Sequence, residues 1–242
     1  MLEGTANSKP KSGNYPKTKV RGSQDCFLDS LFLIMKIDIE NLKKKLDENL
    51  KKHVVDSRVL LSQFRMISDK SKRTGAYQDP TYLPFYYYLG KYIQPENIVE
   101  WGTRLGLLSS CFLKSCKTVK KIFTFQETIN SFFSPRLGLK NIKDVYKGNL
   151  DFYYGGLLDV ELEKKLSCNK WDMFIFNEEW SYDKNMQCLD MMWQYLNLDG
   201  VIVADYLTYS DNCGKAFKDF CQTKNRSPVY FQTRYGVGIM QK

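Results

Sequence analysis

From Pro95 onward, short apolar runs alternate with longer helical patterns, and this alternation constrains the fold more than any other feature of the chain. It predicts strands at 98–101, 121–125, 144–148, 171–176 and 200–206, and helices up to about 116 and near 127–138, 183–196 and 211–223. Residues 228–234 and 236–241 are typical of a closing β-hairpin. Such alternation builds an α/β fold, a mostly parallel sheet with helices on both faces and ligands beyond the carboxyl ends of its strands.

The residues before this domain are different in character. Residues 1–24 are polar and carry five basic side chains, so we expect a basic flexible tail. Residues 25–94 are expected to form an N-terminal helical segment that acts as a cap or interaction arm, and residues 95–242 the main domain. The helices of the N-terminal segment are predicted at 25–36, 38–52, 56–68 and 81–92. The second of them has Ile39, Leu42, Leu46 and Leu50 on one face.

The helix predicted at 81–92 is unusually aromatic, and two interpretations stay open. An aromatic run on a helix is usually core, but it can also form the wall of a substrate or base-stacking pocket. The side chains concerned are Phe85, Tyr86, Tyr87, Tyr88 and Tyr92.

Composition excludes several classes of protein. No apolar run reaches the roughly 18 residues of a membrane span, and the N-terminus lacks the apolar centre of a signal peptide, so we expect a soluble, cytoplasmic protein. The seven cysteines form no CxxC pair and His53 is the single histidine, so no metal site is expected.

The net charge of +9 is concentrated near the N-terminus, where residues 1–75 carry 16 basic and 9 acidic side chains. A basic segment can attract nucleic acid, an acidic protein or a membrane surface, or it can simply keep a protein in solution. The sequence leaves these roles open.

The stretch NIVEWGTRLGLLSS (97–110) joins the first strand of the domain to the helix after it. Counting from Gly102, a dinucleotide fingerprint would need glycines where Arg104 and Leu107 stand, and no GK[ST] sequence follows. The stretch keeps Glu100, Gly102 and Gly106. An acid beside a glycine turn suits a ligand with a cationic amine and ribose hydroxyls better than a pyrophosphate.

This stretch resembles motif I of the class I S-adenosylmethionine-dependent methyltransferases, in the form found in small-molecule O-methyltransferases and cephalosporin-hydroxylase-like relatives. WDMFIFNEEWSY, LNLDGVIVADYL and VYFQTRYGVGIMQK resemble that family's fourth strand, fifth strand and terminal hairpin. The resemblance covers about 95–242. It implies a Rossmann-like methyltransferase fold whose seven strands are ordered 3-2-1-4-5-7-6, with strand 7 antiparallel.

Carried over residue by residue, the resemblance implies S-adenosylmethionine as cofactor and a methyl acceptor that is either a small molecule, as in most of these relatives, or a macromolecule. Asp205 is then the candidate catalytic residue that orients the acceptor's hydroxyl or amine. The positions expected to bind the cofactor are Glu100, Gly102, Thr103, Gly106, Gln126, Glu127 and Asn177.

The chain departs from the family pattern at several of these positions. Gln126 ends the second strand where the family has a ribose-binding acid, and a glutamine binds a hydroxyl more weakly than a carboxylate does. Asn177, Asp205 and Tyr206 supply one charged oxygen ligand at the places of a magnesium site. The family's lysine after strand four has no counterpart, so metal-assisted catechol-type chemistry is not expected.

Three functions are therefore compared. The first is a methyltransferase, in which catalysis comes mostly from positioning the methyl donor and acceptor, so that no histidine base is needed. The second is a non-catalytic protein of this fold that binds a protein partner through its basic N-terminal segment. The third is a nucleic-acid-modifying enzyme that uses the basic segment and Tyr86–Tyr88, although the chain contains no DPPY or NPPY sequence.

Overall fold

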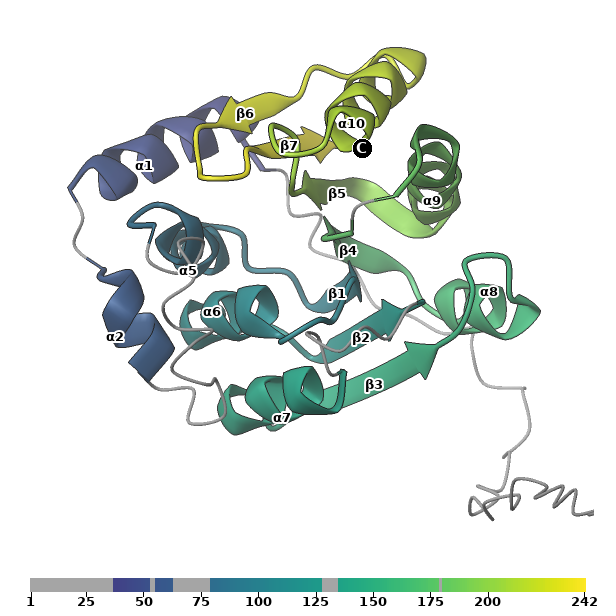
Figure 1. Cartoon of the computed structure of the whole chain (residues 1–242), viewed down its shortest axis with the longest axis horizontal. Coiled ribbons are helices and arrows are strands. Elements are labelled where there is room, and N and C mark those ends of the chain that lie inside the picture. Colours follow the sequence, from purple (N-terminus) through teal and green to yellow (C-terminus); the bar gives the residue numbers. More distant parts are fainter. Residues whose placement is uncertain (1–36, 53–54, 63–78, 128–134, 179) are drawn as a thin grey trace, which may run out of the picture. The chain divides into compact units, whose positions relative to one another are not determined.

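The computed structural model describes residues 37–52, 55–62, 79–127, 135–178 and 180–242, which belong to one compact unit (Figure 1). The expected flexible tail, the helix predicted at 25–36 and His53 lie outside the described residues.

A seven-stranded sheet forms the centre of this unit, in the order β3-β2-β1-β4-β5-β7-β6. Strands β1 to β5 are parallel, whereas β7 runs antiparallel to both β5 and β6. The predicted α/β fold and strand order are confirmed. The strands are Asn97–Trp101 (β1), Lys121–Gln126 (β2), Asn149–Tyr154 (β3), Trp171–Phe176 (β4), Leu196–Ala204 (β5), Val229–Phe231 (β6) and Val237–Gln241 (β7).

The third strand is not where the sequence pattern placed it. The prediction of 144–148 was wrong, because helix α7 (Pro135–Val145) extends into that range and β3 follows it. Ile142 is fully buried on α7, so the apolar pattern in this part of the chain is that of the inward face of a helix. Strand β3 lies at the edge of the sheet and is only half-buried, so its sequence has no strong apolar run. Helix α8 (Val160–Ser167) was not predicted at all.

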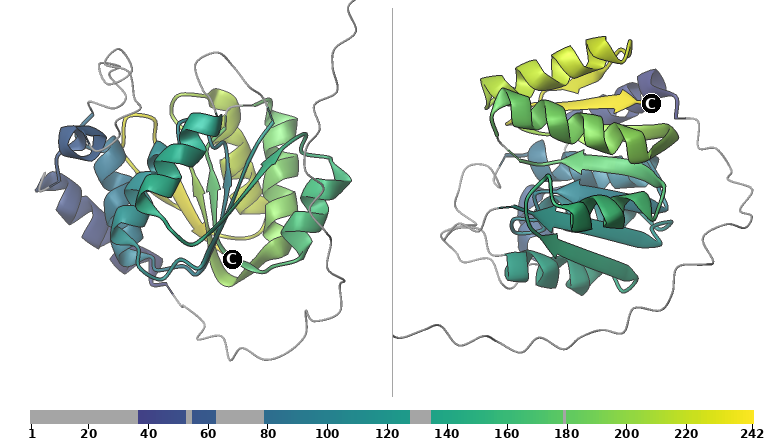
Figure 2. Two further views of the ribbon diagram at one scale, coloured as in Figure 1. Left: turned by 90° about the horizontal axis from the view of Figure 1, so that it is seen from below. Right: turned by 90° about the vertical axis from the view of Figure 1, so that its right-hand side faces the viewer.

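Helices cover both faces of the sheet (Figure 2). Side chains alternate between these two faces and so supply two hydrophobic cores. Ile98 of β1 lies in the core with α5 (Tyr82–Tyr92), α6 (Leu107–Ser115) and α7, and Val99 lies in the opposite core. The helices of that opposite core are α8, α9 (Tyr182–Tyr195) and α10 (Asp211–Thr223).

Helices α1 (Ile39–Lys51) and α2 (Ser57–Ser62) share the core of α5 and α6. On α1 the predicted face is buried at Leu42, Leu46 and Leu50, while Ile39 is only partly covered. The part of the predicted 56–68 helix beyond α2 lies outside the described residues.

Helix α5 packs unusually closely on α6. A Cβ atom added to Gly90 would lie 2.2 Å from the carbonyl oxygen of Phe112 and 2.6 Å from Oγ of Ser115. The glycine therefore allows the two helix backbones to meet.

We expect Gly90→Ala to lower the free energy of unfolding by about 1–3 kcal/mol, because the clash exceeds the gain in helix propensity. Urea denaturation measures this change. Gly156→Ala is the matched control, since its added methyl would have no neighbour closer than 3.6 Å. Equal stability of the two variants would show that α5 and α6 separate without cost.

Candidate functional site

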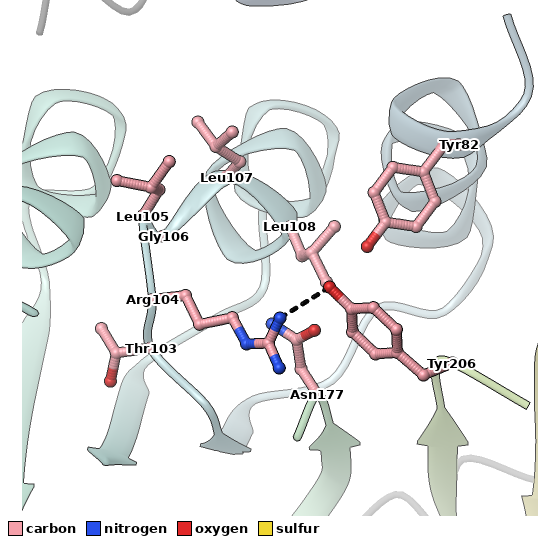
Figure 3. A pocket seen from close by; sticks show the side chains of 9 residues that line it. All are labelled: Tyr82, Thr103, Arg104, Leu105, Gly106, Leu107, Leu108, Asn177 and Tyr206. Carbon is pink, nitrogen blue, oxygen red and sulfur yellow. Dashed lines mark hydrogen bonds between the residues drawn. The ribbon is translucent and has the colours of Figure 1, made fainter. Parts of the chain in front are cut away.

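A small pocket lies where β1, β4 and β5 end, at the point where the strand order reverses (Figure 3). This is the place where ligands bind in open α/β sheets. The space open to the centre of a water molecule is about 30 Å³, enough for roughly two waters. The lining residues are Tyr82, Thr103, Arg104, Leu105, Gly106, Leu107, Leu108, Asn177 and Tyr206.

The turn after β1 passes through three left-handed residues, with φ of 99° at Gly102, 43° at Arg104 and 63° at Gly106. A Cβ on Gly102 would lie 2.2 Å from the carbonyl oxygen of Asn177. A Cβ on Gly106 would lie 2.4 Å from the carbonyl oxygen of Gly138 on α7. Both glycines are therefore required by the packing of the protein itself.

Glu100 is fully buried under α6 and does not line the pocket. Its carboxylate accepts hydrogen bonds from the hydroxyls of Ser109 (2.7 Å) and Thr124 (2.9 Å). Burial raises the pKa of Glu100 to about 7, although the two hydroxyls lower it, and the nearby charge of Glu178 raises it further. The side chain is thus sealed within the chain's own hydrogen bonds.

The two residues expected at the ribose also have partners within the chain. The Oε1 atom of Gln126 accepts a hydrogen bond from the backbone N–H of Arg104 (2.7 Å), and its amide nitrogen donates to Glu178 (3.2 Å). Glu127 forms an ion pair with Lys184 (2.5 Å). Neither side chain lines the pocket.

Of the residues predicted to bind a cofactor, Thr103, Gly106 and Asn177 line the pocket. The amide nitrogen of Asn177 donates to the carbonyl oxygen of Gly102 (3.0 Å). Its Oδ1 atom is buried and has no hydrogen-bond partner among the described residues. This oxygen is an acceptor available to a ligand that carries a donor.

Asp205 follows β5 and is fully buried. Its carboxylate accepts hydrogen bonds from the hydroxyls of Tyr82 (2.7 Å) and Tyr86 (3.0 Å) and from the backbone N–H of Tyr206 (2.7 Å). Burial raises its pKa to about 6, against the lowering effect of these bonds and of Arg104. Asp205 itself does not line the pocket, but two of its partners, Tyr82 and Tyr206, do.

For the five aromatic side chains of α5 named in the sequence, the core interpretation holds. Phe85, Tyr86 and Tyr88 are buried in the core, and Tyr87 and Tyr92 also pack, partly buried, against that core. Part of the pocket wall is formed by Tyr82, which was not among those five.

Three residues at the site were given no part in binding a cofactor or acceptor by the sequence, namely Arg104 and Tyr206, which line the pocket, and Glu178, which pairs with Arg104. One guanidinium nitrogen of Arg104 donates to the hydroxyl of Tyr206 (2.8 Å), and another lies 3.4 Å from a carboxylate oxygen of Glu178. The guanidinium carbon lies 4.7 Å from the centre of the Tyr206 ring. The sequence signal that could have identified Arg104 was its position, since it stands where a nucleotide-binding turn has its second glycine.

No group of three or more His, Cys, Asp or Glu side chains within the described part of the chain is placed to hold a metal ion. Among those same residues, no helix is long and apolar enough to cross a membrane.

No protein-family model and no curated protein matches the sequence. Solved structures do match the fold. An O-methyltransferase from Bacillus cereus in complex with SAH (S-adenosylhomocysteine) has a TM-score of 0.60 and 11% identity, over 83% of this chain and 100% of the other. A putative caffeoyl-CoA O-methyltransferase from Staphylococcus aureus has a TM-score of 0.56 and 13% identity, over 84% of this chain and 99% of the other.

The O-methyltransferase TomG from Streptomyces achromogenes, in complex with SAM (S-adenosylmethionine), has a TM-score of 0.58 and 11% identity, over 85% of this chain and 98% of the other. Likeness at such low identity establishes the fold. This chain has the Rossmann-like methyltransferase fold.

The buried carboxyl of Glu100 makes the stability of the protein depend on pH. The pKa is about 7 in the folded protein, against an ordinary value of 4.5, so folding favours the protonated form. The stabilising contribution is complete below pH 4.5 and is lost as the pH rises to about 7.

We expect the wild-type protein to lose roughly 3 kcal/mol relative to Glu100→Gln between pH 4.5 and 8, as measured by urea denaturation. Asp205 titrates in both proteins, so the difference between them isolates Glu100. Parallel curves for the two proteins would contradict the assigned pKa.

Proposed function

We propose that this chain is an S-adenosylmethionine-dependent methyltransferase that acts on a small-molecule acceptor. The fold supports this, since solved proteins of the same fold carry SAM or SAH. The position of the pocket also supports it, because it lies at the switch point of the sheet, over the turn that follows β1.

The observation that carries the proposal is the unpartnered Oδ1 atom of Asn177. A buried acceptor without a partner costs about 1–3 kcal/mol, and a ligand ammonium group would recover that cost. The amino-acid end of S-adenosylmethionine carries such a group. Thr103, Gly106 and Asn177 are the residues that would hold the cofactor, which supplies the activated methyl group.

The pocket fits this cofactor in its chemistry but not in its present volume. Ligand sites of this kind measure about 300–1,000 Å³, whereas this pocket has about 30 Å³ open to water. Figure 3 shows the side chain of Arg104 crossing the space between the turn and Tyr206. The side chain of Arg104 therefore has to move when the cofactor binds.

On the acceptor side, we assign Tyr82 to contact the methyl acceptor and Asp205 to position Tyr82. The hydrogen bond from Tyr82 to Asp205 fixes the direction of the phenol, and the oxygen of that phenol still has lone pairs that can accept. Correct placement of the acceptor supplies most of what methyl transfer needs from the protein.

A second candidate function is a non-catalytic protein of the same fold. Two observations favour it, namely the small volume of the pocket and the fact that Gly102 and Gly106 are required by internal contacts. The basic N-terminal segment, on which a protein or nucleic-acid partner would depend, lies outside the described residues.

Isothermal titration calorimetry with S-adenosylmethionine and S-adenosylhomocysteine separates the two candidates. We expect binding of both ligands, and we expect Asn177→Ala to weaken it roughly tenfold, because it removes one hydrogen bond to a charged group. No binding of either ligand at about 1 mM, both in wild type and in a variant without the Arg104 side chain, would reject the methyltransferase, since functional sites bind cofactors more tightly than this.

Asn185→Ala provides a matched control. Asn185 is also a fully buried asparagine whose Oδ1 atom has no partner among the described residues, but it lies on α9 and does not line the pocket. Its variant reproduces the loss of a buried amide without touching the site. If both variants weaken binding equally, the assigned role of Asn177 is wrong.

A further inference from the structure

Arg104 lies between an aromatic ring and a carboxylate, which together form a site for a positive charge. Its guanidinium carbon lies 4.7 Å from the centre of the Tyr206 ring, and one of its nitrogens lies 3.4 Å from Glu178. We call the pair Tyr206 and Glu178 the cation cage. The side chain of Arg104 is 17% exposed and that of Glu178 is 8% exposed, so water screens this arrangement weakly.

The cation cage is held in place by contacts that do not involve Arg104. The Tyr206 ring is stacked on Tyr235, with centroids 4.9 Å apart, and meets the edge of Tyr209 at 5.9 Å. Glu178 accepts a hydrogen bond from Gln126 at 3.2 Å. The cage therefore remains organised when the arginine leaves, and a preformed cage binds a cation without a cost of ordering.

The backbone directs Arg104 into this position. The left-handed conformation at Arg104 is fixed by the hydrogen bond from its N–H to Gln126, and the turn is closed by the bond from the Gly106 N–H to the Thr103 carbonyl (2.6 Å). The side chain is thereby carried over the ends of β4 and β5, into the same space that Asn177 lines.

We propose that the cation cage is the binding site for the sulfonium of S-adenosylmethionine, and that Arg104 occupies it until the cofactor displaces the guanidinium. This inference rests on the proposed function. A ring face and a carboxylate attract any desolvated cation, so they suit a sulfonium as well as a guanidinium. Two positive groups cannot share the cage, because like charges in a poorly screened site repel strongly.

The cage also distinguishes the cofactor from its product. Transfer would form a bond from the acceptor's lone pair to the methyl carbon and leave the carbon–sulfur electron pair on sulfur, while a hydroxyl acceptor would release its proton to solvent. The product would then carry a neutral thioether in place of the sulfonium. The attraction of Tyr206 and Glu178 for that sulfur is then lost, and Arg104 regains the cage. The same exchange that slows cofactor entry therefore favours product release.

Calorimetry with S-adenosylmethionine and S-adenosylhomocysteine tests the role of Arg104. Apparent affinity is reduced by the fraction of molecules whose site is open, so removing the guanidinium should raise it. We expect Arg104→Met to bind both ligands roughly tenfold more tightly than wild type. Arg104→Gln should also bind both ligands more tightly. Agreement between the two variants would show that the effect comes from loss of the guanidinium and not from altered packing around methionine.

The cage is tested in the Arg104→Met background, where no guanidinium competes. We expect adding Tyr206→Leu to weaken S-adenosylmethionine roughly tenfold and to change S-adenosylhomocysteine less than about twofold, because only the former carries a charge on sulfur. Adding Glu178→Gln instead is also expected to weaken binding of S-adenosylmethionine more than binding of S-adenosylhomocysteine. Equal losses for both ligands would reject the cage.

Arg58→Met is the control for loss of an arginine. Arg58 is 83% exposed, pairs with Asp56 and does not line the pocket, so its variant should bind both ligands as wild type does. Weaker binding by Arg104→Met would show that Arg104 helps to hold the cofactor, which would overturn this inference. Unchanged affinity would overturn it as well. Absence of binding in wild type and in every variant would instead reject the proposed function itself.

Discussion

The close approach of the β1 turn to the end of β4 is the constraint on which the site depends. No side chain fits at Gly102, because the carbonyl oxygen of Asn177 lies 2.2 Å from the place of a Cβ atom. This contact fixes the left-handed path of the turn, and that path carries Arg104 over the ends of the neighbouring strands. A glycine that sequence patterns associate with a ligand is thus first a glycine for the protein's own packing.

Three acidic side chains are buried around this turn, and each is stabilised differently. Glu100 is held by two hydroxyls, Asp205 by two tyrosines and a backbone N–H, and Glu178 by Gln126 and Arg104. Burial raises the pKa of both Glu100 and Asp205. Of the three, Glu178 is the one that contacts a cation directly, so it has the clearest electrostatic relation to a positively charged ligand.

The sequence was sufficient for most of the fold. The apolar runs that became β1, β2 and β4 are strongly patterned and buried on both faces, so their positions were predicted to within a residue or so. Strand β3 was misplaced because an edge strand buries little and its pattern is weak. The predicted helix at 211–223 matches α10, whose N-cap Ser210 accepts a hydrogen bond from the Cys213 N–H.

The site was less accessible to sequence reasoning. The strand order implied by the family resemblance placed the ends of β1, β2, β4 and β5 side by side, but it could not show which side chains point into the pocket. Glu100 turned inward because alternation along β1 places it on the α6 face. Tyr82 joined the site because α5, far away in the sequence, packs beside the carboxyl edge, and its hydroxyl reaches Asp205 across 123 positions of the chain.

A crystal structure of the protein grown with S-adenosylmethionine tests the central claim most directly. We predict an adenosyl group over the Gly102–Gly106 turn, the sulfonium against Tyr206 and Glu178, and the guanidinium of Arg104 displaced from the ring. Arg104 still stacked on Tyr206 at saturating cofactor, with no ligand over the turn, would contradict it.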